Sequence, residues 1–199
     1  MRFIFLFFIS LILLSACSMF SPVNTGPTNT YMLNISPQPA TKKPIGHINV
    51  VVPQPTTSPI YNTTDIAYTT HPYQIAYLAK SAWAETPPQM LQPLIIDTLQ
   101  KTHYFYSVGS PTEISQYRYI LNTQIIKLEQ DFSYLPNTVR LVLRAQIIDA
   151  STSQILATKE FAASEMIQQN NTYAGIQAAN RATARVLKQL ANFCLRYMK

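Results

Sequence analysis

One cysteine near the N-terminus stands where acylation chemistry would use it. Cys17 follows Leu14-Ser15-Ala16, and an apolar run that begins at Phe3 after the basic Arg2 leads up to them. This order is typical of a bacterial secretion signal that ends in a lipobox, so we predict that Cys17 becomes the lipidated first residue of the mature protein. The alternative is an uncleaved anchor helix with an incidental cysteine, although the apolar run is shorter than the roughly 20 residues of a membrane span.

The residue after the cysteine bears on which membrane carries the anchor. Ser18, and not an aspartate, follows Cys17, which favours the periplasmic face of the outer membrane. We therefore predict a signal peptide (1–16), an acylated cysteine with a flexible tether rich in Pro, Ser, Thr and Asn (17–30), and one domain (31–199).

The other residues that could bind a metal, bind phosphate or act as catalysts do not have the spacing that such sites need. The histidines at 47, 71 and 103 have no cysteine or carboxylate at ligand spacing, and the four glycines form no phosphate-binding loop. No metal site and no cofactor are therefore predicted. Glu85 and Asp97 could act as an acid–base pair, against the alternative of two solvated carboxylates near a helix. We predict no catalytic residue and a protein that is not an enzyme.

The second cysteine has no intramolecular partner once Cys17 carries lipid. Cys194 lies on the apolar stripe of a predicted helix, which favours a small buried hydrophobic side chain. An intermolecular disulfide and a reactive thiol are the alternatives.

Charge argues against nucleic acid as a partner. The formal net charge is +6, only 12% of the residues are charged, and no Lys/Arg run exceeds Lys42-Lys43. A nucleic-acid surface needs a clustered basic stripe, and a polybasic site for lipid head groups needs a denser cluster than this.

An aromatic cluster is the main candidate for binding. Five Tyr and Trp residues lie within one short segment: Tyr61, Tyr68, Tyr73, Tyr77 and Trp83. Such side chains are favoured at protein interfaces, so we predict that they bind a partner. The alternatives are that the rings line the core and edge of a sheet, or that they line a lipid-binding pocket.

Residue patterns predict the elements that hold these groups. Strands are expected at residues 31–35, 47–52, 65–69 and 104–108. Thr86 to Gln89 read as a helix start with a capping box, and Pro93 predicts a kink or a later start. The strand at about 117–128 changes its apolar phase, which predicts a β-bulge near Ile125. Residues 138–149 and 153–162 predict an antiparallel hairpin, and residues 173–197 a helix with one apolar stripe.

This order of elements favours an α+β fold. We expect a mainly antiparallel sheet with two helices packed on one face.

Several segments in order resemble one family. The segments Tyr61–Tyr68, Tyr73–Tyr77, Ser81–Pro87 and Met90–Leu94 are similar to the signature of the ABC-type transport auxiliary lipoproteins. Later segments resemble the central strands and the last helix of that family: Leu128–Phe132, Val139–Gln146 and Ala178–Ala182. The resemblance runs from about Tyr31 to Cys194.

The resemblance implies a role in MCE-type lipid transport systems of bacteria with two membranes. The protein would be a non-catalytic auxiliary component that docks on a periplasmic MCE-domain protein while its lipid anchor holds it in the outer membrane. The docking surface is expected at the Tyr61–Trp83 segment or at a strand edge near Val50–Val52. Because MCE partners are ring-shaped, a homo-oligomer is among the expected states. The alternatives are a carrier that holds phospholipid between the sheet and the helices, and a structural envelope lipoprotein.

Overall fold

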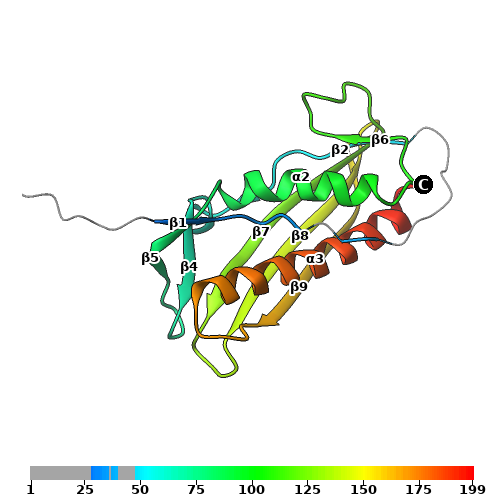
Figure 1. Ribbon diagram of the computed structural model, residues 1–199. Helices are drawn as coiled ribbons and strands as arrows, with labels where there is room; N and C mark the ends of the chain where they lie inside the picture. Colours follow the sequence, from blue (N-terminus) through cyan, green and yellow to red (C-terminus); the bar gives the residue numbers. More distant parts are fainter. Residues whose placement is uncertain (1–27, 36, 40–47) are drawn as a thin grey trace, which may run out of the picture.

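The computed structural model describes residues 28–35, 37–39 and 48–199. The predicted signal peptide, Cys17 and the predicted tether up to residue 27 lie outside these residues, so what was expected of them stays a prediction. The described part forms one sheet of nine strands, and two α-helices cover one face of it (Figure 1).

The elements follow one another in an α+β order. The strands are β1 (Asn29–Tyr31), β2 (Asn49–Val51), β3 (Thr56–Thr57), β4 (Asp65–Thr69), β5 (Ala76–Trp83), β6 (Ser107–Gly109), β7 (Tyr119–Asp131), β8 (Thr138–Asp149) and β9 (Gln154–Met166). The helices are the 3-10 turn η2 (Pro59–Tyr61), α2 (Pro87–Gln100) and α3 (Thr172–Tyr197).

The long strand β7 organises the sheet. One edge of β7 pairs with β8 in antiparallel fashion along its whole length, and β8 pairs with β9 in the same way. The other edge of β7 carries three short strands in succession, β2, β3 and β4, and all three run parallel to it. Prolines 53, 55 and 59 interrupt this edge because proline has no N–H for a strand ladder.

The expectation of a mainly antiparallel sheet is therefore wrong. The sheet is mixed, because β1 also runs parallel to β5 and β6 parallel to β2. Since β2 pairs with β6 on one side and β7 on the other, Val50–Val52 offers no free strand edge. Such pairings join segments that are far apart in the sequence, and local alternation carries no information about them.

Local patterns predicted the second half of the chain well. The register of β7 against β8 shifts between Ile125 and Lys127, which confirms the predicted β-bulge. The bulge lets Ile125 and Leu128 both face the core, although residues three positions apart in a regular strand face opposite sides. The β8–β9 hairpin is confirmed, and β9 continues four residues beyond its predicted end at 162.

Helix α2 begins at its predicted cap. The side-chain Oε1 of Gln89 accepts a hydrogen bond from the backbone N–H of Thr86 at 3.0 Å, as a capping box requires. The helix continues through Pro93 to Gln100, so the alternative of a later start is wrong. Pro93 lies on an exposed part of α2, where its ring meets solvent.

Helix α3 packs its predicted stripe against β8 and β9. Asn171 caps the helix, because its Oδ1 accepts a hydrogen bond from the N–H of Ala174 at 2.8 Å. The buried residues of the stripe include Ile176, Val186, Leu187, Leu190, Phe193 and Cys194. Where α3 crosses β7, Gly175 leaves room for the buried side chain of Gln130: a Cβ at Gly175 would lie 2.6 Å from its Nε2 and Oε1.

The segment after β1 is fastened across the two helices. The N–H of Leu33 lies 3.4 Å from the Sδ of Met90 on α2. On α3, the buried Asn180 side chain accepts hydrogen bonds from the N–H groups of Asn34 and Ile35 and donates one to the carbonyl of Met32. One carboxamide thus binds three backbone groups of residues 32–35, which keeps the N-terminal part of the domain against α3.

Candidate docking surfaces

Two of the five aromatic residues predicted to bind a partner lie inside the protein. Trp83 is 5% exposed and belongs to the core beneath α2 and α3. Tyr61 is 8% exposed, and its hydroxyl donates a hydrogen bond to Oε2 of Glu129 at 2.6 Å. For these two residues the core alternative describes the structure better than an interface does.

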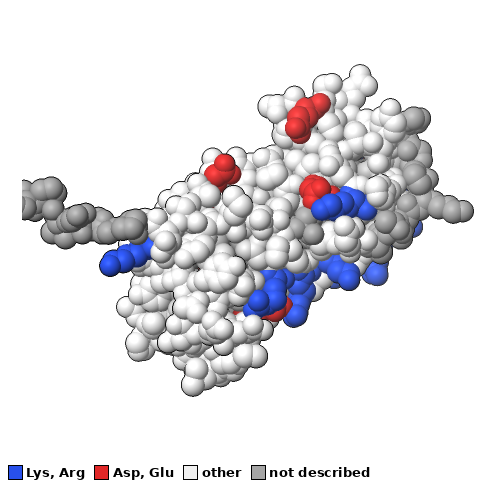
Figure 2. Space-filling view, viewed as in Figure 1, with Lys and Arg blue, Asp and Glu red and all other residues white. Residues whose placement is uncertain are grey.

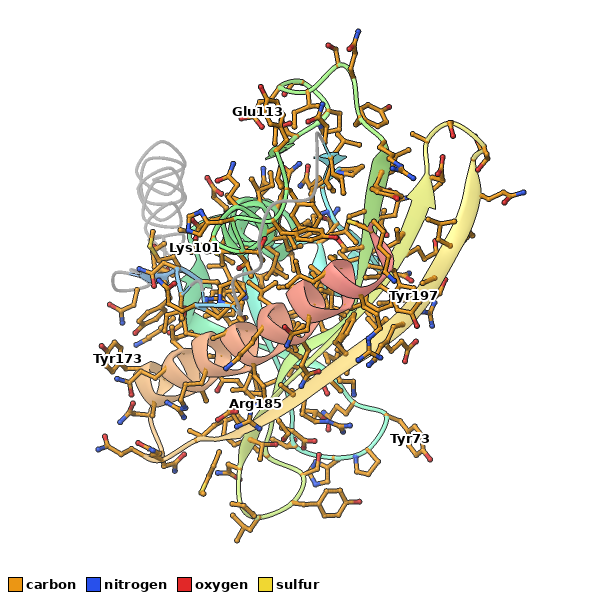
Figure 3. All side chains as sticks on the ribbon, turned by 90° about the vertical axis from the view of Figure 1, so that its right-hand side faces the viewer. Tyr73, Lys101, Glu113, Tyr173, Arg185 and Tyr197 are labelled. Carbon is orange, nitrogen blue, oxygen red and sulfur yellow. The ribbon has the colours of Figure 1, made fainter. Side chains whose placement is uncertain are left out.

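The other three aromatic residues reach the surface to different extents. Tyr68 is half-buried, and its ring meets Phe132 edge-on at 6.1 Å between centroids. Tyr77 is partly exposed, and its hydroxyl donates to the carbonyl of Ile60 at 3.2 Å. Tyr73 is fully exposed at the turn between β4 and β5, and its ring points away from the domain (Figure 3). The five residues therefore do not form one binding surface.

A buried carboxylate beneath Tyr61 is structural in character. Lys127 donates to Oε1 of Glu129 at 2.9 Å, and Tyr61 donates to Oε2, so both oxygens of this 5%-exposed residue are satisfied. Burial, and then the hydrogen bond to Glu129, raises the pKa of Tyr61 above its ordinary value, so the phenol stays protonated. The cluster ties η2 to β7 and offers no free base.

A cleft opens beside this cluster between two loops. It has a volume of about 450 Å³ and is lined by side chains that include Tyr73, Tyr134, Lys127, Asp131 and Arg140. Arg140 lies 3.8 Å from Asp131, so the cations and anions of the cleft compensate one another. The cleft has aromatic side chains in its wall but no nucleophile with an activating base.

The two loops that flank the cleft expose large apolar side chains. We call residues 70–75, between β4 and β5, and residues 132–137, between β7 and β8, the tip loops. Tyr134 is 73% exposed and Leu135 is 88% exposed, next to the fully exposed Tyr73. The sequence analysis missed Tyr134 and Leu135. The sequence feature that could have identified them is an apolar pair followed by proline in the loop of a hairpin, where polar residues are usual.

Strand β9 presents the longest free edge among the described strands. It pairs with β8 along one side only, over Gln154–Met166. A shallow hollow of about 230 Å³ lies next to this edge, between Lys159 of β9 and Phe193, Arg196 and Tyr197 of α3. Backbone groups at a free edge can bind an added strand, and the hollow could take a side chain of that strand.

Catalytic and metal chemistry gain no support from the described residues. Asp97 pairs with Lys101 at 2.6 Å, and it lies ten residues along α2 from the helix start that Glu85 precedes. At 1.5 Å per residue about 15 Å of helix lies between that start and Asp97, so Glu85 and Asp97 are not placed side by side as an acid–base pair needs. No group of three His, Cys, Asp or Glu residues in the described part of the chain could hold a metal ion.

Cys194 is fully buried in α3, as the favoured interpretation predicted. Burial raises the pKa of its thiol, which disfavours the reactive thiolate. The described helices include none with the length and apolar character to cross a membrane.

Comparison with known proteins places this fold in a recognised group. The family model for the ABC-type transport auxiliary lipoprotein component matches residues 31–191. The crystal structure of protein XCC0632 from Xanthomonas campestris has a TM-score of 0.79 at 18% identity and covers 85% of this chain and 96% of that chain. The crystal structure of an uncharacterized protein has a TM-score of 0.68 at 14% identity, covering 84% of this chain and 99% of that chain.

A third solved structure shares the fold more distantly. The hypothetical protein CT253 from Chlamydia trachomatis has a TM-score of 0.54 at 8% identity and covers 76% of this chain and 98% of that chain. At such identities the likeness concerns the fold alone. No significant match was found among the curated proteins.

Proposed function

Because this chain belongs to the family of ABC-type transport auxiliary lipoprotein components, we propose that it is the docking component of an MCE-type ABC lipid transport system. In this proposal, acyl chains on Cys17 hold the protein at the periplasmic face of the outer membrane. The domain binds a periplasmic MCE-domain protein and catalyses nothing, and ATP hydrolysis belongs to other subunits. The lipobox ahead of the domain supports the anchor, and the absence of a catalytic constellation among the described residues supports a binding role.

The free edge of β9 is the observation on which the docking role rests. Its thirteen residues pair on one side only, and Ile155, Leu156 and Met166 expose apolar side chains along it. Natural proteins usually shorten or cover such an edge, since it can pair with another chain. A partner strand added to β9 would gain backbone hydrogen bonds, while the hollow beside Phe193 would select a side chain.

Charge on the neighbouring helix favours an acidic partner. Arg181 and Arg185 share the single carboxylate of Glu165, at 3.5 and 2.6 Å, while Lys188 and Arg196 extend the basic strip along α3. Figure 2 shows Lys and Arg side chains gathered along this helix. An acidic strand in the partner would therefore be attracted to β9 and held in register.

The role of a phospholipid carrier receives less support from the geometry. Core side chains fill the layer between the sheet and the helices, and the hollow beside Trp83 and Leu128 has a volume of only about 10 Å³. An acyl chain in that layer would have to displace packed side chains. No observation favours the third role, that of a structural envelope lipoprotein.

Crosslinking in cells tests the docking proposal. A photoreactive amino acid at Leu156 or Ser164 of β9 should capture an MCE-domain protein, whereas the same residue at Thr112, in the exposed loop after β6, should not. Lys159→Glu and Arg196→Glu should each weaken the capture, since they reverse the charge beside the edge. The proposal is wrong if the anchored protein captures no MCE-domain protein from either β9 position.

A further inference from the structure

We propose that the tip loops contact the surface of the membrane that holds the lipid anchor, with Tyr73, Tyr134 and Leu135 at the level of the head groups. This inference rests on the proposed acylation of Cys17. It assigns Tyr73 to a lipid surface in place of a protein partner, and it gives the domain a fixed orientation on the membrane.

The direction of β1 brings the tether from the side of the tip loops. Strand β5 starts directly after the first tip loop and runs away from it, and β1 pairs with β5 in parallel, with Asn29 opposite Ser81. The N-terminal end of β1 therefore faces the same way as the end of β5 that leaves the tip loop. Ser81 lies five positions after Ala76 in β5, so Asn29 lies about 17 Å along the strand from the end of that loop.

The length of the tether keeps this end of the domain close to the membrane. Residues 18–27 and Thr28 connect Cys17 to β1, and eleven residues span at most about 40 Å when fully extended. Helix α3, with 26 residues, is itself about 39 Å long and leads from the tip end of the domain toward the opposite end (Figure 1). The tether is thus long enough for the tip end to reach the bilayer, whereas the C-terminal end of α3 lies at the end of the domain away from β1 (Figure 1).

The side chains of the tip loops suit a lipid surface. Tyr73, Tyr134 and Leu135 are the most exposed large hydrophobic side chains of the described residues. Tyrosine is enriched at membrane interfaces, where its apolar ring and polar hydroxyl match the head-group region. Neither loop contains an acidic residue, and Asp131 at the base of the second loop is paired with Arg140, so anionic lipids meet no free carboxylate there.

Depth-dependent quenching tests this contact in the full-length acylated protein. The protein is reconstituted into vesicles of phosphatidylethanolamine and phosphatidylglycerol that carry nitroxide-labelled head groups. An environment-sensitive fluorophore is attached at Leu135→Cys or, as the matched control, at Thr152→Cys in the turn between β8 and β9. That turn lies at the opposite end of the sheet (Figure 1). Buried Cys194 stays unlabelled, and acylation occupies the Cys17 sulfur.

We expect the label at 135 to shift to the blue and to be quenched several-fold more strongly than the label at 152. Adding Tyr73→Ser and Tyr134→Ser should reduce the quenching at 135 toward the level at 152, while the protein still floats with the vesicles. Equal quenching at 135 and 152 in floating protein overturns the inference. The inference is also overturned if the fluorophore at 135 shifts to the blue only after a protein partner is added to the vesicles. Flotation reports the anchor and crosslinking at β9 reports docking, so the failure of either part of the proposed function is distinguishable from failure of the tip contact.

Discussion

Replacing Gly175 by alanine probes the closest approach between α3 and the sheet. The new Cβ would lie 2.6 Å from the carboxamide of Gln130, so this side chain, which is buried at 4% exposure, would have to shift. Overpacking of this kind costs about 1–3 kcal/mol. Alanine gains about 1 kcal/mol over glycine within a helix. We therefore expect Gly175→Ala to lower the free energy of unfolding by about 1 kcal/mol, although the same change in an uncrowded helix raises it.

A double-mutant cycle in urea isolates the contact. In a Gln130→Ala background the clash is absent, so Gly175→Ala should raise the free energy of unfolding by roughly 0.5–1 kcal/mol from helix propensity. The two backgrounds should thus give opposite signs, with a coupling of about 2 kcal/mol, a size expected only of residues in contact. A Gly175→Ala protein that is more stable than the wild type would refute the close approach as the reason for glycine at this position.

Three buried groups give further predictions. Cys194 should resist a thiol reagent in the folded protein and react once urea unfolds it, because burial raises the pKa of the thiol; reaction at neutral pH without denaturant would contradict this. Tyr61→Phe should lower the free energy of unfolding by about 1.5–3 kcal/mol, since one oxygen of buried Glu129 loses its donor. The raised pKa of Tyr61 also means that the unfolded chain loses this proton first, so the wild type should lose stability as pH rises above about 10, and more steeply than Tyr61→Phe. Asn180→Ala should speed deuterium exchange at the N–H groups of Asn34 and Ile35, with the amides of β8 unchanged; unchanged protection at residues 34 and 35 would contradict the fastening described above.

Sequence patterns predicted the elements whose signals are local. The cap at Thr86, the β-bulge after Ile125 and the apolar stripe of α3 each depend on residues a few positions apart, so the sequence pattern alone predicts them. The predicted position of the first strand is wrong: β1 lies at 29–31, whereas a strand was expected at 31–35. Strand β5 was not predicted, because the sequence from Ala76 to Trp83 mixes Lys and Ser with small residues and has no clear alternation.

The candidate surfaces were harder to predict than the elements. Aromatic residues mark both cores and interfaces, and only the path of β4, β5 and η2 decides between the two. That path buries Trp83 and Tyr61 but leaves Tyr73 in solvent. The edge of β9 is free because, among the described strands, only β8 pairs with β9. A local sequence pattern does not indicate which strands will pair with a given strand, so this edge could not be predicted.

The arrangement of partners along β7 decides when the chain can fold during synthesis. Synthesis delivers the N-terminal part first, yet Val50 pairs with Tyr119 and Tyr68 pairs with Gln130, so β2 to β4 are made before the strand that they pair with exists. Strands β7 to β9 pair with their sequence neighbours and can form quickly once they emerge. Until then the early segment must stay unpaired, and its short strands and prolines make it a poor template for aggregation. The interruption of the sheet edge that β2, β3 and β4 form beside β7 thus protects the first half of the chain from aggregation until β7 is available for pairing.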